Sequence, residues 1–279
     1  MKNQEIFLNR LNKLLESDQG TLPVFSAVSL KIQLELIKDH PDLKVIEKFI
    51  TEDQSLSSTV LRIANSVKYC GLIETTTVKS AIVRLGMAEI MQIVCTDINN
   101  KMFSSHDAAI DAIMKRLWQH SVGCAFSAGI LANTLSCGVL QDEAFSAGLF
   151  HDIGKLFVLK IIDDKKNKKY LGFSDDYMLE VIESLHAKQG YRLMTRMKLP
   201  RMYAVVARDH HQHKYDRDNP LLVLVKLANN ICHQLGIGLV ANPSLDIMTT
   251  EEAALLNLTE PILEKLRKFL MNNPNFAGL

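Results

Sequence analysis

The sequence lacks long apolar runs and an excess of charge of one sign, and we expect its amino terminus not to be a secretion signal. Its longest apolar stretches, such as residues 220–225, are too short to cross a bilayer, and its amino terminus has no uninterrupted apolar core. The 32 Lys and Arg residues nearly balance the 31 Asp and Glu residues, so the formal charge is only +1. Such a chain has no global field to attract nucleic acid or an anionic membrane. We therefore expect a cytoplasmic protein that binds neither.

Motifs of several common enzyme classes are also missing. The sequence has no G-x-S-x-G elbow, no G-x-x-x-x-G-K-[ST] loop and no H-E-x-x-H pair, which disfavours acyl-transfer hydrolases, P-loop nucleotidases and ordinary metalloproteases. The cysteines are odd in number, scattered along the chain and without a C-x-x-C pair: Cys70, Cys95, Cys124, Cys137 and Cys232. This usage is typical of a reducing compartment, and we interpret the cysteines as packing residues.

What the sequence does have is helical periodicity. Hydrophobic residues make up 47% of the 279 residues, enough for a substantial core. They recur at intervals of three and four positions almost everywhere, and strand-like alternation is hard to find. We predict an all-α fold, a multi-helix bundle in two packed helical halves over residues 1–104 and 105–279. The seam near residues 104–107 has no run of Gly, Ser or Pro, so it is not a flexible linker.

Local signals predict several helix boundaries. Residues 75–77 can cap a helix that runs to Gly86, Asp142 opens another helix, and Thr250 can cap a short helix near the carboxyl end. We expect loops over residues 20–23, 68–73, 104–106, 163–176 and 236–249. Short connectors of this kind are usual between packed helices.

The sharpest local signal is the segment His151-Asp152-Ile153-Gly154-Lys155, which follows an apolar run. Adjacent side chains on a helix point about 100° apart, so His151 and Asp152 can reach one ion only near a helix end or a distorted turn. Gly154 supplies such a break. An imidazole nitrogen and a carboxylate oxygen suit a divalent transition metal, and Lys155 adds a positive charge for a phosphate oxygen. The segment therefore predicts a pair of metal ligands beside a cation that can contact phosphate.

Two ligands do not make a site, so the other histidines of the nine in the chain matter. A single histidine in a helix is more often a hydrogen-bonded core or surface residue than a ligand. Four of them fall in predicted helices beside small or apolar neighbours and can face the same interior if the helices pack as a bundle: His120, His186, His210 and His211. We interpret the histidines beside loops or polar sequence as structural or surface residues: His40, His106, His213 and His233.

The order of these residues resembles the HD phosphohydrolase superfamily, and the surrounding sequence narrows the resemblance to the HDOD family. The order is His120, His151-Asp152, His186 and His210-His211. Further matching positions are Leu22-Pro23, Ala64-Asn65-Ser66 with Tyr69, Ala81-Ile82 with Leu85-Gly86, Trp118 to Ser121, Ala144-Phe145 with Gly148-Leu149, and Leu199-Pro200. The resemblance covers about residues 5–270. It implies a bipartite all-α fold whose second half carries the HD-type cavity, and a bacterial regulatory role that does not require catalysis.

The chain departs from the catalytic pattern of that superfamily in three places. Where HD enzymes complete the site with an aspartate, this chain has the neutral Asn229, so the resemblance implies weaker metal binding, or one ion rather than two. Where some HD-GYP enzymes place a carboxylate four residues before the first histidine, this chain has Arg116. No Gly-Tyr-Pro signature follows the double histidine. The resemblance therefore does not predict that this chain hydrolyses cyclic dinucleotides.

Three hypotheses follow. The first is a signal-transduction or regulatory protein, weakly catalytic or non-catalytic, whose His/Asp cavity binds a metal or small ligand and whose amino-terminal half binds a signalling partner. The second is a slow metal-dependent phosphohydrolase acting on a phosphomonoester, nucleotide or phosphodiester, in which Asp152 and Lys155 are catalytic. The third is a helical scaffold whose histidines hydrogen-bond one another. For the first two we expect Fe, Mn, Ni or Zn, as one ion or two, held by His120, His151, Asp152, His186, His210, His211 and Asn229.

Overall fold

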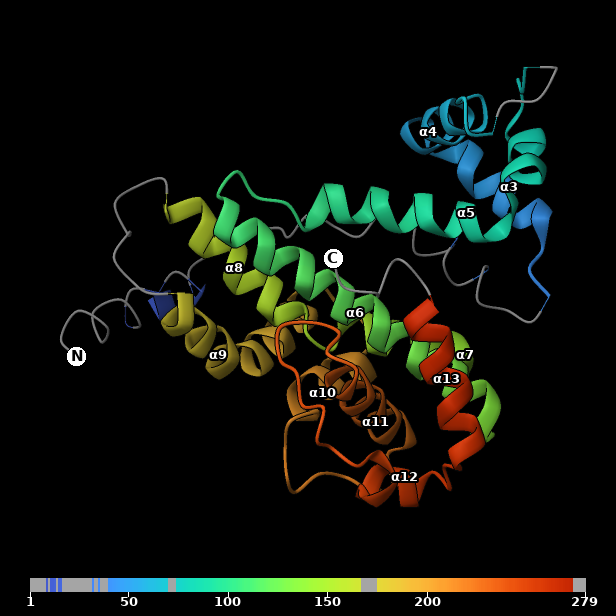
Figure 1. Ribbon diagram of the computed structural model, residues 1–279. Helices are drawn as coiled ribbons and strands as arrows, with labels where there is room; N and C mark the ends of the chain where they lie inside the picture. The colour runs from blue at the N-terminus through green and yellow to red at the C-terminus, as the bar shows by residue number, and fades with distance from the viewer. Residues whose placement is uncertain are drawn as a thin grey trace. The chain divides into compact units, whose positions relative to one another are not determined.

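The computed structural model is helical wherever it describes regular structure (Figure 1). It describes residues 9, 11–13, 15–16, 32, 35, 40–69, 74–166 and 175–272. No strand occurs among these residues, so the predicted all-α class is confirmed. None of the described helices combines the length and the apolar character needed to cross a membrane. The helices are α3 (Leu43–Glu52), α4 (Gln54–Ala64), α5 (Val78–Met102), α6 (Ala108–Leu135), α7 (Gln141–Phe150), α8 (Ile153–Lys166), α9 (Asp175–Arg196), α10 (Arg201–Asp209), α11 (Pro220–Gln234), η1 (Ile247–Thr249), α12 (Glu251–Leu255) and α13 (Glu260–Asn272).

The chain divides into two compact units. One comprises Pro23–Phe103, and the other comprises Met1–Leu22 together with Ser104–Leu279. Each unit has its own set of buried apolar side chains. Compactness does not show that a unit folds by itself, so the predicted division into domains over residues 1–104 and 105–279 stays a prediction.

In the smaller unit, α3, α4 and α5 contact one another. The side chains of Asp42 and Asp53 cap α3 and α4 by accepting hydrogen bonds from backbone N–H groups in their first turns. Helix α5 follows Thr77, whose Oγ1 accepts a hydrogen bond from the Ser80 N–H at 3.1 Å. Gly86 interrupts α5 with φ 76° and ψ 167°, angles that glycine adopts at little steric cost. The predicted helix that ends at Gly86 is therefore confirmed as the first segment of α5.

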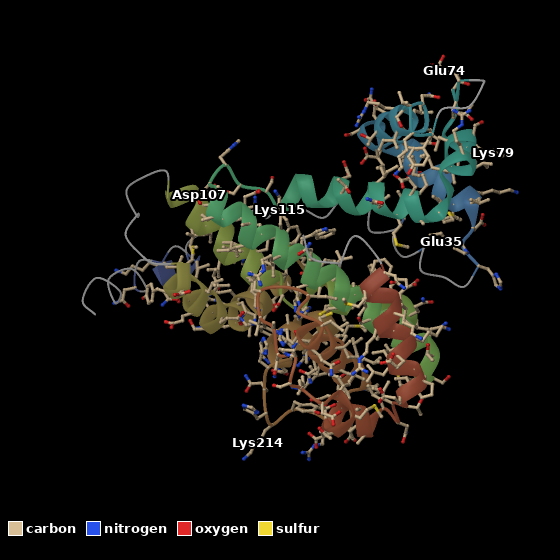
Figure 2. All side chains as sticks on the ribbon, in the orientation of Figure 1. Glu35, Glu74, Lys79, Asp107, Lys115 and Lys214 are labelled. Carbon is tan, nitrogen blue, oxygen red and sulfur yellow. The ribbon has the colours of Figure 1, made fainter. Side chains whose placement is uncertain are left out.

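Helix α6 is the central helix of the larger unit. Asp107 caps its amino-terminal end through two backbone N–H groups of the first turn, and Figure 2 shows Asp107 at the start of α6 with Lys115 further along. Almost every residue from 117 to 132 is buried, because α7, α8, α11 and α13 pack against α6. A helix that is enclosed on all sides tolerates few charged side chains. His120, on this stretch of α6, therefore lies in the core.

Some predicted boundaries differ from the structure. Residues 163–166 continue α8 and Asp175 begins α9, so the loop predicted for residues 163–176 is wrong at both ends, while residues 167–174 lie outside the described part. The Ser105 Oγ atom donates a hydrogen bond to Asp163 Oδ1 at 2.6 Å, a tertiary contact that local composition does not reveal. The predicted loop at residues 20–23 and the end of the one at 68–73 also lie outside the described residues.

Two further helix starts were predicted from polar residues. Helix α7 begins at Gln141, with Leu140 at the capping position and Asp142 in the first turn, so it starts one residue before the predicted position. Thr250 caps α12 as predicted, because its Oγ1 accepts a hydrogen bond from the Ala253 N–H at 3.3 Å. The short polar side chains thus mark helix starts to within about a residue.

Candidate metal centre

The His151-Asp152 pair lies at the junction of two helices. Helix α7 ends one residue before the pair and α8 begins one residue after it. This helix-end geometry lets adjacent side chains reach one point. Gly154 does not make the break, contrary to the expectation from sequence, because it lies within α8. It instead lets α8 approach the backbone of α9, since a Cβ on Gly154 would lie 2.7 Å from the Gly190 nitrogen.

Imidazoles from four segments surround Asp152. His120 comes from α6, His186 from α9, His151 from the α7–α8 junction, and His210 directly follows the end of α10; each is at most 3% exposed. The Asp152 Oδ2 atom lies 3.6 Å from His120 Nε2 and 3.5 Å from His151 Nε2. The Asp152 Oδ1 atom lies 3.4 Å from His186 Nε2 and 3.3 Å from His210 Nε2. The carboxylate therefore stands between two pairs of histidines.

All four histidines present the same ring nitrogen to Asp152. Each Nδ1 lies near a main-chain carbonyl oxygen: His120 near Ile237 (3.0 Å), His151 near Gly148 (2.7 Å), His186 near Glu183 (2.8 Å) and His210 near Ala207 (3.0 Å). A carbonyl can only accept a hydrogen bond, so Nδ1 carries the proton and donates it. A neutral imidazole then has its lone pair on Nε2, which is the usual arrangement of a metal-binding histidine.

This proton placement argues against a scaffold of mutually hydrogen-bonded histidines. The Nε2 atoms of His120 and His151 lie 3.3 Å apart, yet each carries a lone pair when Nδ1 is the donor. Two acceptors at this distance repel each other unless a proton or a cation lies between them. The arrangement therefore calls for a positive charge at the centre.

The donor atoms form two groups that share Asp152. Within each group the ligand atoms lie within 4.8 Å of one another, and the groups are Asp152 with His186, His210 and His211, and Asp152 with His120 and His151. His211 is the exposed member. The Asn229 Oδ1 atom lies 3.0 Å from His120 Nε2 and so adjoins the second group. The structure therefore brings together all the residues that the sequence nominates as ligands.

Burial and neighbouring charges together set the charge of these side chains. Burial lowers the pKa of His120 and of His151 to about 4, so both are neutral near pH 7. Burial alone would raise the pKa of Asp152, but the Lys155 ammonium and the surrounding histidines outweigh it and hold that pKa well below its usual value. The Asp152 carboxylate is therefore charged beside the neutral imidazoles of His120 and His151.

Several of these polar atoms have no well-aligned hydrogen bond. Asp152 Oδ1 and the Nε2 atoms of His186 and His210 are buried without such a bond, and so is Asp152 Oδ2, which has only the Lys155 ammonium 3.0 Å away. Leaving buried acceptors unsatisfied costs about 1–3 kcal/mol each, so such a set normally has a ligand. Imidazole nitrogen with carboxylate oxygen is the donor set that suits Zn, Fe, Mn and Ni. The residues present therefore fit a transition-metal ion.

Lys155 offsets the charge of Asp152. Its Nζ lies 3.0 Å from Asp152 Oδ2 and 2.6 Å from Glu183 Oε1. Burial alone would lower the pKa of Lys155, but these two carboxylates outweigh it and raise that pKa, so Lys155 is a cation. Glu183 is not among the residues predicted from sequence. The signal that could have identified it is its position one turn before His186 on α9.

A loop over His120 fixes its ring. The Ile237 carbonyl accepts the Nδ1–H of His120. The next residue, Gly238, has φ 115°, and a Cβ there would lie 2.7 Å from His120 Cβ. Arg116, one helical turn before His120, donates to the Gly238 carbonyl from Nη2 at 2.7 Å and from Nε at 3.1 Å. Arg116 thus holds the loop in place through these two hydrogen bonds, an arrangement that we call the Arg116 clamp.

Replacing Arg116 by alanine should loosen this loop. We expect the free energy of unfolding to fall by about 1 kcal/mol, because the variant removes a charged hydrogen-bond donor at a partly exposed position. Chemical denaturation measures the change. Lys115→Ala is the matched control, since Lys115 is the neighbouring residue and pairs with Asp111 at 2.8 Å on the surface. Equal losses in the two variants would contradict the clamp.

The histidines interpreted as structural or surface residues lie in two settings. Three of them are exposed: His40, His106 and His213. His233 instead stacks on His120, with ring centroids 5.2 Å apart and planes inclined by 18°. It follows Asn229 by four residues on α11. That helical spacing from a nominated ligand is the signal that could have placed His233 beside the centre.

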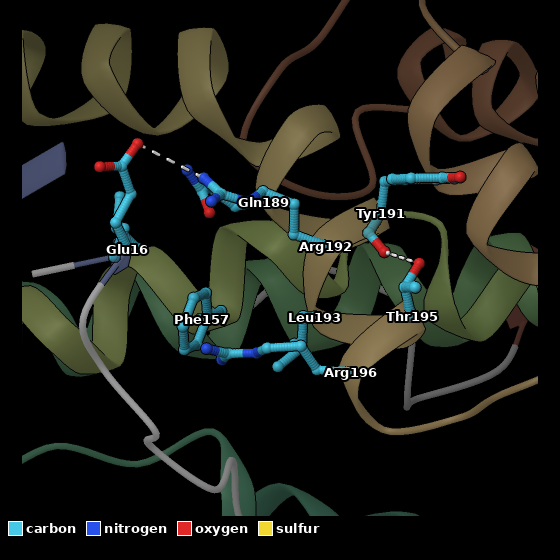
Figure 3. A pocket seen from close by; sticks show the side chains of 9 residues that line it. Glu16, Phe157, Gln189, Tyr191, Arg192, Leu193, Thr195 and Arg196 are labelled. Carbon is cyan, nitrogen blue, oxygen red and sulfur yellow. Dashed lines mark hydrogen bonds and ion pairs between the residues drawn. The ribbon is translucent and has the colours of Figure 1, made fainter. Parts of the chain in front are cut away.

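A separate cavity lies beside α9 (Figure 3). Its volume is about 310 Å³, and its lining includes Phe157, Gln189 and Arg196. Arg192, also in the lining, has its Nη1 atom 3.7 Å from Glu16 Oε1, the ion pair that Figure 3 marks with a dashed line. No lining residue belongs to the His/Asp centre. The cavity and the candidate metal centre are therefore different places in the larger unit.

Several solved structures share the fold of this chain. A candidate signal transduction protein from Marinobacter aquaeolei VT8 aligns with a TM-score of 0.59 at 20% identity, over 98% of this chain and 65% of that one. An HDOD domain protein of unknown function from Geobacter sulfurreducens aligns with a TM-score of 0.57 at 17% identity, over 95% and 94%. A candidate metal-dependent phosphohydrolase from Shewanella amazonensis SB2B aligns with a TM-score of 0.53 at 19% identity, over 95% and 100%. At such identities the similarity shows the fold alone.

Sequence comparison identifies the family. An uncharacterised protein from Treponema pallidum (strain Nichols) is 22% identical over 220 residues, which are 75% of this chain and 41% of that protein. The chain thus spans less than half the length of this relative. The family model of the HDOD domain matches residues 22–213, which is more than half of the chain and confirms the resemblance drawn from the histidine and aspartate order. The chain therefore belongs to the HDOD domain family.

Proposed function

We propose that this HDOD protein is a regulatory protein whose His/Asp centre binds a divalent transition metal. The observation that carries the proposal is the set of four histidine Nε2 atoms within 3.6 Å of the two oxygens of Asp152. The residues that would hold the metal, as one ion or as two sharing Asp152, are His120, His151, Asp152, His186, His210, His211 and Asn229. A bound ion would link α6, α9, α10 and the α7–α8 junction. Metal occupancy would therefore be coupled to the stability of the larger unit.

The enclosure of the centre favours regulation over rapid turnover. His151 and Asp152 are each 1% exposed, and Lys155 is 3% exposed. The Lys155 ammonium, which could otherwise contact a phosphate, is already held by Asp152 and Glu183. His211, the exposed member of the donor set, marks the side from which a phosphorylated small molecule would enter. Because the centre is enclosed and Lys155 is already paired, we expect any hydrolysis at this centre to be slow or absent.

A signalling context is part of this proposal. HDOD membership and the fold shared with a candidate signal transduction protein support it. We assign the partner-binding surface to the amino-terminal half, residues 1–104, and the site of action to the cytoplasm. The partner would then respond to the occupancy of the centre in the other half of the chain.

Elemental analysis of untagged protein tests the metal proposal. We expect a divalent transition metal in the wild-type protein and a lower unfolding temperature after chelation. The His210→Ala variant should retain the metal about 100-fold less tightly, because it removes one ligand from the shared carboxylate. His213→Ala is the matched control, since His213 is exposed and only three residues further along. A metal-free wild type, or equal retention by the two variants, would refute the centre.

A slow phosphohydrolase is the second candidate function. It is favoured by the cluster of four histidines around the Asp152 carboxylate and by the fold shared with the Shewanella protein. A bound metal would supply a nucleophilic water and stabilise negative charge on the phosphoryl oxygens. Asp152 would orient that water, and Lys155 would offset the developing charge. Metal-dependent turnover of a phosphomonoester, nucleotide or phosphodiester that His151→Ala abolishes would favour this candidate over the regulatory one.

A further inference from the structure

A third group of donor atoms, in addition to the two that share Asp152, lies on the side of His120. The Nε2 atom of His120 and the sulfur atoms of Cys124 and Cys232 lie within 4.8 Å of one another, and all three residues are buried. The Cys124 Sγ atom is 3.6 Å from His120 Nε2. From the sequence alone both cysteines are interpreted as packing residues. Their position beside a candidate metal ligand gives them a second interpretation.

The packing of α11 on α6 places the sulfur atoms of Cys124 and Cys232 beside His120. Cys124 follows His120 by one turn of α6, so the two side chains share a helix face. Helix α11 comes close to α6 at Gly123, where a Cβ would lie 3.2 Å from Cys232 Sγ. Cys232 follows Asn229 by about one turn of α11, and Asn229 Oδ1 contacts the same His120 nitrogen. Helix α11 thus presents an amide oxygen and a thiol to one imidazole.

The charges around His120 leave a place for anionic ligands. Asn229 is neutral, and the Lys155 ammonium at 3.0 Å already offsets the charge of Asp152. A dication held by these groups would keep a net positive charge in buried surroundings, which is costly. Two thiolates would cancel that charge. The two thiolates would therefore supply the negative charge that the neutral Asn229 cannot supply.

We propose that Cys124 and Cys232 are ligands of the ion bound by His120, which makes this half of the centre a Cys₂His site for a thiophilic metal such as zinc. The inference rests on the proposed function, because it assigns further ligands and a metal class to the same centre. Each thiol releases its proton to solvent when the metal binds. Two thiolates and one neutral imidazole then surround the dication without net charge. Cys124, Cys232 and His120 leave a fourth position on the ion, for which Asp152 Oδ2, His151 Nε2 and Asn229 Oδ1 are available at 3.6, 3.3 and 3.0 Å from His120 Nε2.

X-ray absorption spectroscopy of the untagged, zinc-loaded full chain tests this assignment. We expect sulfur neighbours about 2.3 Å from zinc in addition to nitrogen neighbours at about 2.0–2.1 Å. A spectrum with nitrogen and oxygen neighbours alone would overturn the assignment of Cys124 and Cys232 and leave the His/Asp proposal standing. Failure to bind zinc, manganese, iron or nickel would overturn both proposals. The two failures are therefore distinguishable in wild-type protein.

Cysteine variants identify which sulfurs bind. The double variant Cys124→Ser/Cys232→Ser should lose the sulfur signal, and Cys137→Ser, beyond the end of α6, should keep it. Cobalt(II) gives a second readout, because sulfur ligands add near-ultraviolet charge-transfer absorption that nitrogen and oxygen ligands do not. If circular dichroism shows that the serine variant is unfolded, Cys124→Ala/Cys232→Ala replaces it, since buried cysteine behaves as a small apolar residue. A folded double variant that retains the sulfur signal would overturn the proposal.

Discussion

Gly154→Ala is expected to lower the free energy of unfolding by about 3 kcal/mol or more. A Cβ on Gly154 would overlap the main-chain oxygen of His186 and would lie 2.7 Å from the Gly190 nitrogen. Both obstacles are backbone atoms, so rotation of a side chain cannot relieve them and α8 must move away from α9. Denaturant unfolding of the metal-free protein measures the loss. Because Asp152 precedes α8 and His186 lies on α9, the same variant should also bind metal more weakly.

Gly190→Ala is the matched control for this prediction. A Cβ on Gly190 would lie 3.4 Å from the Gly154 nitrogen and 3.5 Å from Ala207 Cβ, which are ordinary van der Waals contacts. Alanine within a helix is favoured over glycine by about 0.5–1 kcal/mol, so the net change should be small and of either sign. A Gly154→Ala protein as stable as this control would show that α8 and α9 are not held as closely as the structure has them.

The clustering of the nominated residues around Asp152 was predictable because these residues carry local signals. His151 and Asp152 are adjacent in the sequence, and the helical setting of His186 and His210 places them on inward faces. The hydrogen bonds that orient three of the rings are also local. His151, His186 and His210 each donate to the carbonyl three residues earlier. Short-range geometry of this kind follows from helix periodicity alone.

The contacts that hold the His120 ring in place could not be predicted in the same way. Its Nδ1 partner, the Ile237 carbonyl, is 117 positions away, and the Arg116 contact with Gly238 spans 122 positions. No local pattern specifies which loop covers a helix when such distances separate the two. The proximity of Cys232 to His120 has the same origin, because it depends on how α11 packs against α6.

The fold class was predictable for a different reason. Apolar residues repeat at helical intervals through most of the chain, and this pattern is stronger than any single boundary signal. The errors occur where polar composition resembles a loop, as at residues 163–166, which continue α8. There the contact of Ser105 with Asp163 stabilises a helical turn that composition would assign to solvent.

Asn229→Asp is expected to tighten metal binding beside His120 by about 100-fold. Asn229 Oδ1 lies 3.0 Å from His120 Nε2, so an aspartate would put a charged oxygen in the same place. A dication attracts an added unit charge at about 4 Å by several kcal/mol even at an effective dielectric constant of about 20. The cost of burying the carboxylate offsets part of this gain. Calorimetric titration, or competition with a chelator, measures the affinity.

The same substitution should act in the opposite direction without metal. It then places a second buried carboxylate near Asp152, and like charges in a buried site destabilise each other, so the metal-free variant should unfold at a lower temperature than the wild type. Asn230→Asp is the matched control, because Asn230 is half-buried and points about 100° around α11 from Asn229. It should change affinity by less than about tenfold, since its charge lies further from the centre. Equal effects of the two variants would exclude Asn229 as a ligand position.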